Sequence, residues 1–169
     1  ESERYRFEEL IGRGGMGVVL RGFDKLLSRE VAVKFLSPEL NENEDARNVF
    51  LSEARAMAQL SHPNLVSVYD VGVIEGNVMM VVEFVAGNDL FKLLRQRDPP
   101  VGLHQQTVLH VGVQLCRVIG YMHSKDMIHR DLKPANVILQ EDGTIKLIDF
   151  GLSRTLETLA ARSTRVRGT

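Results

Sequence analysis

The chain has 169 residues, is 44% hydrophobic and 25% charged, and carries a formal net charge of −1. This balance is typical of a soluble globular protein, and it provides no overall positive field that would recruit nucleic acid or an anionic membrane. The single cysteine, Cys116, excludes an intrachain disulfide framework and favours a reducing, cytoplasmic compartment. Because Cys116 lies in an apolar helical pattern, we expect it to be a small core residue. No apolar run reaches the length of a membrane span, so we expect no membrane segment in this chain, and an anchor outside it stays an open alternative.

The first half of the chain has the pattern of strands around one helix. Short runs of β-branched and aromatic residues, separated by turn residues, predict five strands. A helical apolar pattern over residues 44–60 follows the third strand, with Phe50, Ala54, Met57 and Ala58 on its apolar face, and Pro63 prevents its continuation. The predicted strands cover residues 5–11, 18–22, 31–36, 66–73 and 78–84.

The second half changes character after residue 84. A joint at residues 86–88 leads into helical patterns over residues 89–96 and 104–124, and two short strands follow at 137–139 and 145–148. We therefore predict an α+β protein in which a sheet-rich part joins a helical part, an arrangement that often forms a ligand cleft. The longer helix is expected to bury the stripe Val108, Val111, Leu115, Val118, Ile119 and Met122.

Residues 12–17 contain the pattern G-x-G-x-x-G. In a dinucleotide-binding protein such a loop opens into a helix. Here Val18, Val19 and Leu20 continue as a strand, so we predict the tip of a β-hairpin. Glycines at such a tip let backbone N–H groups approach phosphate oxygens, although a plain flexible hairpin is the alternative.

A strand lysine and a helix glutamate form the next candidate site. Side chains alternate along a strand, so Ala32 and Lys34 share one face, which suits a flat apolar ring next to a phosphate. Glu53 lies on the apolar side of the predicted helix, where a carboxylate needs a partner, and Lys34 is the natural candidate. The alternatives are a solvated edge lysine and an exposed glutamate.

The run from His129 to Asn136 places a carboxylate, an ammonium and a carboxamide in one loop, as phosphoryl transfer requires. A hairpin follows, with Asp142-Gly143 as its turn, and antiparallel pairing should bring Asn136 and Asp149 together. A carboxylate and a carboxamide, completed by phosphate oxygens and water, suit Mg²⁺. Zinc is not expected, because the sequence has no Cys/His cluster at ligand spacing.

Five motifs in this order resemble those of the eukaryotic-like Ser/Thr protein kinases. They are the glycine loop at 12–19, V-A-V-K at 31–34, Glu53, H-R-D-L-K-P-A-N at 129–136 and D-F-G at 149–151. The string G-R-G-G-M-G-V-V resembles the bacterial branch. The resemblance covers nearly the whole chain. It implies a protein-kinase-like two-lobed fold, with an antiparallel N-lobe sheet and one main helix in residues 1–85 and an incomplete helical C-lobe in residues 86–169.

The resemblance also implies ATP as the phosphoryl donor and a Ser or Thr of a protein substrate as the acceptor. Asp131 would orient the substrate hydroxyl and Lys133 would neutralise the γ-phosphate. Lys34, paired with Glu53, would contact the α- and β-phosphates. The residues implied in nucleotide binding are Ile11, Gly12, Gly14, Gly17, Val19, Ala32, Lys34, Glu83, Val85, Asp89 and Ile138.

The same resemblance implies that Asn136 and Asp149 hold Mg²⁺. Arg130, which precedes Asp131, resembles kinases that are switched by phosphorylation, and the segment after Gly151 offers several Ser and Thr acceptors without singling one out. Autophosphorylation and self-association are therefore possible.

The sequence ends at Thr169, before the family's A-P-E motif. We accordingly expect a fragment with weak activity. The alternative is a non-catalytic nucleotide-binding or interaction module.

Overall fold

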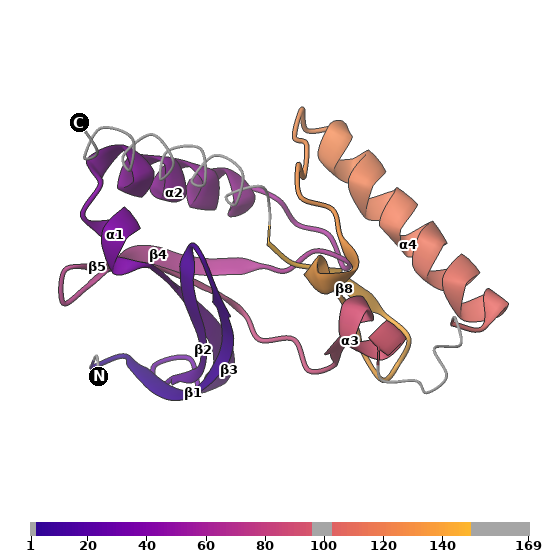
Figure 1. Ribbon diagram of the computed structural model, residues 1–169, viewed down its shortest axis with the longest axis horizontal. Helices are drawn as coiled ribbons and strands as arrows, with labels where there is room; N and C mark the ends of the chain where they lie inside the picture. Colours follow the sequence, from indigo (N-terminus) through magenta and orange to yellow (C-terminus); the bar gives the residue numbers. More distant parts are fainter. Residues whose placement is uncertain (1–2, 96–102, 150–169) are drawn as a thin grey trace. The chain divides into compact units, whose positions relative to one another are not determined.

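The computed structural model describes residues 3–95 and 103–149, and these residues form two compact units (Figure 1). The first unit contains residues 3–59 and 67–84, and the second contains residues 60–66, 85–95 and 103–149. A single domain boundary near residue 85 stays a prediction, since the segment 60–66 groups by its contacts with the second unit. Phe150, Gly151 and the possible phosphorylation segment that follows lie outside the described residues.

The first unit is built on a five-stranded antiparallel sheet, as the sequence predicts. The strand order is β1-β2-β3-β5-β4, so β3 lies in the middle of the sheet. The β1–β2 and β4–β5 pairs are hairpins, and the β3–β5 pair closes the sheet between them. The strands are β1 (Tyr5–Gly14), β2 (Gly17–Asp24), β3 (Arg29–Leu36), β4 (Val68–Ile74) and β5 (Asn77–Glu83).

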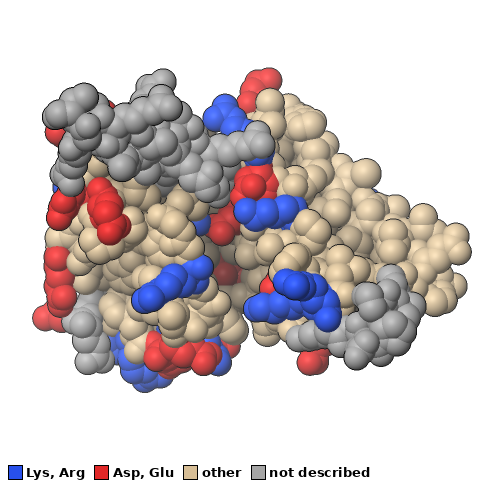
Figure 2. Space-filling model, in the orientation of Figure 1, with Lys and Arg blue, Asp and Glu red and all other residues tan. Residues whose placement is uncertain are grey.

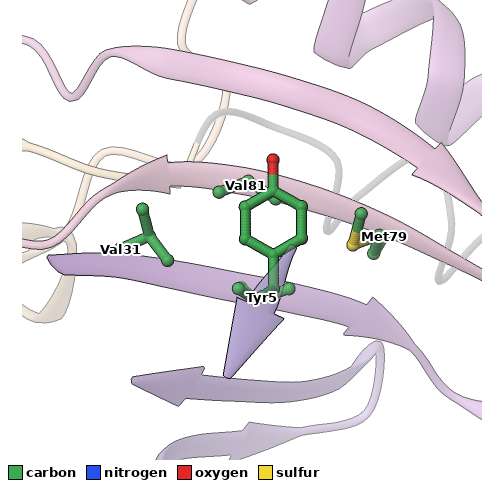
Figure 3. Close-up of a cluster of buried hydrophobic side chains, with 5 residues drawn as sticks. Tyr5, Val31, Met79 and Val81 are labelled. Carbon is green, nitrogen blue, oxygen red and sulfur yellow. The ribbon is translucent and has the colours of Figure 1, made fainter. Parts of the chain in front are cut away.

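One face of this sheet buries a hydrophobic cluster (Figure 3). Val31 and Val33 from β3 contribute to it, and Phe35 packs against it, which confirms the predicted alternation along this strand. Ala32 and Lys34 consequently lie on the opposite face. The buried members of the cluster are Tyr5, Val31, Val33, Met79 and Val81.

Helix α2 (Glu44–Met57) contacts the sheet through β4. Its N-terminus is capped by Asn43, whose Oδ1 accepts a hydrogen bond from the Ala46 amide at 3.0 Å. The helix ends earlier than predicted, because the last turn tightens into a bond from the Gln59 amide to the Ala56 carbonyl. Ala58 is therefore an exposed C-cap and not part of the apolar face. The buried residues of α2 are Ala46, Phe50, Ala54 and Met57. A short helix that the sequence did not predict, α1 (Pro38–Asn41), precedes α2.

The second unit combines helices with a three-stranded antiparallel sheet of order β6-β7-β8. The predicted hairpin is confirmed, since β7 and β8 pair with Leu139 opposite Ile145. Gly87, in the predicted joint, has φ +150°, and a Cβ there would lie 2.5 Å from the Leu139 carbonyl oxygen, so only glycine allows this close approach. The elements are β6 (Asn88–Asp89), α3 (Leu90–Arg95), α4 (Gln105–His123), the 3₁₀ turn η1 (Pro134–Asn136), β7 (Val137–Leu139) and β8 (Ile145–Leu147).

Helix α4 packs against β8 with a narrower apolar stripe than the sequence predicts. Val111, Val118 and Met122 are buried as expected, whereas Val108 is 51% exposed. Cys116 is exposed, so the prediction of a core cysteine is wrong. The reason is helical geometry, since a residue five positions beyond Val111 points away from the stripe.

The outer surface of α4 is unusually apolar. Leu109 and Val113 are exposed there, and Arg117 is the one charged residue in the helix. The surface over α4 correspondingly shows almost no charged side chains, whereas basic and acidic groups are interspersed elsewhere on the visible face (Figure 2). Within residues 3–95 and 103–149, no helix has both the length and the apolar character needed to cross a membrane.

At the tip of the β1–β2 hairpin, neighbouring backbone atoms confine Gly17, whereas Gly14 and Gly15 have free space beside them. Gly17 has φ +140°, and a Cβ there would lie 1.9 Å from the Phe35 carbonyl oxygen. The Ser37 amide also donates a hydrogen bond of 2.8 Å to the Met16 carbonyl. A Cβ on Gly14 or Gly15, by contrast, would meet no atom within 4 Å. Glycine is therefore structurally required only at the β2 end of the tip.

Arg4, near the start of the chain, forms ion pairs with Asp24 at the end of β2 and with Asp70 on β4. The guanidinium of Arg4 bonds the fully buried Asp24 carboxylate at 2.9 Å and the Asp70 carboxylate at 2.8 Å. The Tyr5 hydroxyl donates to the same Asp70 oxygen at 2.8 Å. The hydrogen bond from Arg4 lowers the pKa of Asp24, and burial, together with the bond to Asp70, raises the pKa of Tyr5.

Gly17→Ala should lower the free energy of unfolding by about 3 kcal/mol, because the new methyl group collides with backbone atoms that cannot move independently. Gly14→Ala is the matched control and should change it by less than about 0.5 kcal/mol. Urea denaturation of both variants measures the difference. Equal losses would contradict the asymmetric hairpin tip.

Arg4→Met should lower the free energy of unfolding at pH 7 by on the order of 2 kcal/mol, because it leaves the buried Asp24 carboxylate without its cation. The control Arg6→Met removes a surface pair with Glu8 and an exposed contact with the Phe23 ring, and it should cost less than about 1 kcal/mol. Urea denaturation measured from pH 2 to pH 11 provides the comparison.

The pH dependence follows from the two pKa shifts. Because its pKa is lowered, Asp24 stabilises the fold above pH ~4, and this contribution is lost as the pH falls further. The difference in free energy of unfolding between wild type and Arg4→Met should therefore become smaller in acid. The raised pKa of Tyr5 stabilises the fold below pH ~10 and is lost above it. An Arg4→Met penalty that persisted unchanged at pH 2 would refute this account.

Candidate active site

The glycine loop is part of a β-hairpin in the first unit. Gly12 lies opposite Val19 and Gly14 opposite Gly17 in the β1–β2 register. The chain continues after Gly17 as strand β2 and not as a helix. This excludes the dinucleotide-binding interpretation of the motif, which requires a helix at that point. Ile11, on β1, is 41% exposed, so an apolar ligand could cover it.

Lys34 is buried, with 7% of its surface exposed, and lies on the central strand β3. It faces Val19 on one neighbouring strand and Met80 on the other. The alternative of a solvated edge lysine is therefore wrong. A buried ammonium requires a compensating negative charge, and the partly buried Glu53 on α2 belongs to the same unit. The Lys34–Glu53 pair stays a prediction.

Further candidates for nucleotide binding lie in the middle of β3 and at the end of β5. Ala32 is 7% exposed and lies opposite Val82. The amide of Glu83, at the end of β5, donates a hydrogen bond of 2.9 Å to the carbonyl of Ser67, just before β4, so that N–H group already has a partner within the first unit.

In the second unit, Val85 is 9% exposed, and Asp89 lies opposite Ile138 in the β6–β7 pair. Asp89 has a structural task that the sequence analysis did not assign. Its Oδ1 accepts a hydrogen bond of 2.8 Å from the Lys92 amide in the first turn of α3, and its Oδ2 lies 3.3 Å from Lys92 Nζ.

His129 anchors the loop that carries the charged candidates. It is 5% exposed, and burial lowers its pKa, so the imidazole is neutral at pH 7. Nδ1 accepts a bond of 3.3 Å from the Asp131 amide, and Nε2 lies 3.3 Å from the Ile148 carbonyl oxygen. One neutral tautomer, protonated at Nε2, satisfies both contacts and joins this loop to the residue after β8.

The carboxylate, ammonium and carboxamide of the H-R-D-L-K-P-A-N motif meet at Asp131. Its Oδ2 accepts from Lys133 Nζ at 2.7 Å and from Asn136 Nδ2 at 3.1 Å. Asn136 Nδ2 also donates to the Asp131 backbone carbonyl at 2.8 Å. Two donors on one oxygen fix the orientation of this carboxylate. Arg130, just before it, has φ +63°, a strained conformation for a non-glycine residue.

The residues at the open end of the β7–β8 hairpin fit a magnesium ion. Asn136 is 4% exposed, and because its amide nitrogen bonds to Asp131, its oxygen is the atom left to act as a ligand. The Ile148 amide donates to the Asn136 carbonyl at 2.9 Å, which brings Asn136 close to the residue that precedes Asp149. Both side chains offer the hard oxygen ligands that Mg²⁺ prefers. Among the described residues, no three His, Cys, Asp or Glu side chains form a metal cluster. A magnesium ion held by these two side chains would take its remaining ligands from phosphate and water.

The sequence analysis missed a polar residue on α4 that lies beside this hairpin. Gln114 on α4 is 8% exposed and bonds directly to the hairpin backbone. The available signal was a polar residue within the stripe defined by Val111 and Val118.

Comparisons with known proteins agree with this geometry. Residues 5–169 match the family described as the protein kinase domain. A probable serine/threonine-protein kinase of Clostridium acetobutylicum is 38% identical over 154 residues, which are 90% of this chain and 23% of that protein. The serine/threonine-protein kinase PrkC of Bacillus subtilis is 37% identical over 158 residues, which are 93% of this chain and 24% of that protein. The chain thus spans about a quarter of the length of these curated relatives.

Solved structures give the same result for the fold. The apo form of PpkA-294 has a TM-score of 0.85 and 25% identity, covering 96% of this chain and 64% of that one. A mutant of the PknI kinase domain from Mycobacterium tuberculosis has a TM-score of 0.74 and 29% identity, covering 89% of this chain and 61% of that one. These similarities confirm the predicted α+β, protein-kinase-like fold. The relatives named above are serine/threonine-protein kinases of bacteria, and the chain belongs to the protein kinase domain family.

Proposed function

We propose that the chain is the ATP-binding and catalytic-loop part of a serine/threonine protein kinase, which transfers the γ-phosphate of ATP to a hydroxyl of a protein substrate. The observation that carries this proposal is the arrangement around Asp131, whose carboxylate is oriented by Lys133 and Asn136. A fixed carboxylate can accept the proton of an incoming hydroxyl, and an adjacent ammonium can stabilise the charge on a transferring phosphoryl group.

The first unit would supply phosphate and adenine contacts. The open backbone at Gly14 and the hairpin partners Gly12 and Gly17 support a phosphate-binding role, and the buried Lys34 supports a contact with the α- and β-phosphates. Ile11, Val19, Ala32 and Ile138 are the apolar side chains proposed to contact the adenine ring. Backbone groups of Glu83 and Val85 would hydrogen-bond its edge.

Asp89 would reach the ribose in this proposal. Since its carboxylate already caps α3, such a contact would have to be shared with the Lys92 amide.

Asn136 and Asp149 would hold Mg²⁺ beside the phosphates. The bound ion supplies positive charge that neutralises the phosphate oxygens during transfer. The chain's own part is to present a carboxamide oxygen and a carboxylate from the two ends of one hairpin, an arrangement supported by the bond between Ile148 and Asn136.

The competing proposal is a non-catalytic nucleotide-binding or interaction module. The retained Lys34, Asp131 and Asp149 favour catalysis, because a module that only binds does not need an oriented carboxylate. Weak activity of this chain alone, autophosphorylation and a cytoplasmic location stay predictions. Self-association also stays a prediction, supported by exposed Leu109 and Val113 on α4.

Mg²⁺ should strengthen ATP binding to the wild-type protein, and Asp149→Ala should remove on the order of tenfold or more of that gain because a carboxylate ligand is lost. Isothermal titration calorimetry with and without Mg²⁺ measures both. Glu141→Ala, an exposed carboxylate in the turn of the same hairpin, is the control and should behave as wild type. ATP binding that ignored both Mg²⁺ and the Asp149 substitution would remove the metal assignment.

In a version of the protein that contains the complete kinase domain, Asp131→Asn should reduce the turnover number for phosphate transfer by about 10²–10⁴-fold while leaving ATP affinity nearly unchanged, because this carboxylate acts mainly in the transition state. Lys34→Met should also reduce turnover, with a loss of ATP affinity. The control Asp126→Asn makes the same change at an exposed site. Radiolabelled ATP and a serine- and threonine-containing protein provide the assay, and near-normal turnover of Asp131→Asn would disprove the assignment.

A further inference from the structure

Two buried carboxamides form a hydrogen-bonded pair in the second unit. Asn64, in the segment before β4, is 7% exposed, and Gln114 on α4 is 8% exposed. Asn64 Nδ2 donates to Gln114 Oε1 at 2.7 Å. Buried amide groups are costly unless they are bonded, so the pair should have further specific partners.

Those partners are backbone groups of the β7–β8 hairpin. Gln114 Oε1 accepts a second bond from the Ile145 amide at 3.0 Å, and Gln114 Nε2 donates to the Gly143 carbonyl at 3.0 Å. Asn64 Nδ2 donates to the Ile145 carbonyl at 3.0 Å. The pair thus holds both backbone groups of Ile145 and the turn that precedes it.

The backbone of the Asn64 segment continues this contact along β8. The Leu147 amide donates to the Asn64 carbonyl at 2.9 Å, and the Val66 amide donates to the Leu147 carbonyl at 3.0 Å. Leu65 and Leu147 form a parallel bridge. Since β8 is an edge strand of its sheet, these bonds satisfy the backbone groups that β7 does not reach.

An edge strand held in this way cannot shift its register easily, and a shift of one residue would move every side chain to the other face. Asp149 lies two residues beyond the last residue of β8, and the Ile148 amide bonds to the carbonyl of Asn136. The position of β8 therefore sets the position of both candidate magnesium ligands.

We propose that Gln114, together with Asn64, is a positioning residue for the metal-binding end of the β7–β8 hairpin. This inference rests on the proposed assignment of Asn136 and Asp149 to Mg²⁺. Gln114 touches neither the ion nor the nucleotide. It acts by fixing the edge strand that carries Asp149, and a small displacement of a ligand is enough to weaken a metal site.

The test compares Gln114→Met, which keeps the side-chain volume but removes the hydrogen bonds, with Val118→Ala. Val118 is fully buried one turn further along the same helix, so its truncation destabilises α4 without touching the pair. Two quantities are measured well below the thermal midpoint of each variant. They are the exchange rate of the Ile145 amide by NMR, and the Mg²⁺ concentration that gives half of the full increase in ATP affinity by calorimetry.

Gln114→Met should speed Ile145 amide exchange at least tenfold and raise the required Mg²⁺ concentration by about tenfold, with ATP affinity in the absence of Mg²⁺ unchanged. Val118→Ala should alter neither quantity. Gln114→Glu keeps an oxygen that can accept the bonds from Asn64 and Ile145, but it replaces the donor to Gly143 with a carboxylate oxygen that repels the Gly143 carbonyl. It should shift both quantities in the same direction, and it replaces Gln114→Met if that variant does not fold.

Unchanged Mg²⁺ dependence in the Gln114 variants, beside clear Mg²⁺ dependence in wild type, would overturn the positioning role and leave the proposed function intact. Equal shifts in Val118→Ala would also overturn it, because general destabilisation of α4 would then be sufficient. Wild-type ATP binding that ignores Mg²⁺ would instead overturn the metal assignment, and the positioning role with it.

Discussion

Antiparallel backbone pairing places nearly every candidate group of this chain. In the first unit, the β1–β2 ladder closes the glycine loop, and the β2–β3 ladder sets Val19 opposite Lys34. In the second, the β7–β8 ladder returns the chain so that the Ile148 amide reaches the Asn136 carbonyl. These are ordinary main-chain hydrogen bonds, each worth little alone, but together they fix registers that side chains could not fix. The chemistry of the chain therefore depends on hairpins more than on helices.

Asp24 and Asp131 each form an ion pair, and the difference in burial gives the two pairs different roles. Asp24 is fully buried and bonded by Arg4, so its charge contributes to stability and has no access to a ligand. The Asp131 side chain is 18% exposed and its partner Lys133 is 50% exposed. A pair in contact with water costs little to rearrange, since water replaces the lost contact. Asp131 and Lys133 can thus exchange their mutual contact for a substrate hydroxyl and a phosphate, whereas Asp24 and Arg4 cannot.

The sequence predicted the five strands of the first unit, both main helices and the β7–β8 hairpin, because alternation, helical periodicity and the Asp142-Gly143 turn are local signals. It missed the two-residue strand β6, where it expected a joint and the start of a helix, because only pairing with β7 defines that strand. It could not predict that β3 is central and Lys34 therefore buried, since strand order is a tertiary property. It also overestimated the apolar stripe of α4. Periodicity gives the direction of a buried face, but its width depends on the neighbouring element, here β8. Gln114 was overlooked for the same reason, because its partners are backbone atoms that no sequence pattern marks.

The hairpin tip that is fixed at Gly17 and open at Gly14 and Gly15 has a further thermodynamic consequence. Ordering a backbone residue costs roughly 1–2 kcal/mol of conformational entropy, and glycine loses more than any other residue. Gly17 has already lost that freedom in the folded chain, since the backbone of Phe35 confines it. Gly17 therefore makes no further entropic demand when a phosphate binds at the tip, because the folded chain has already ordered that part of the loop.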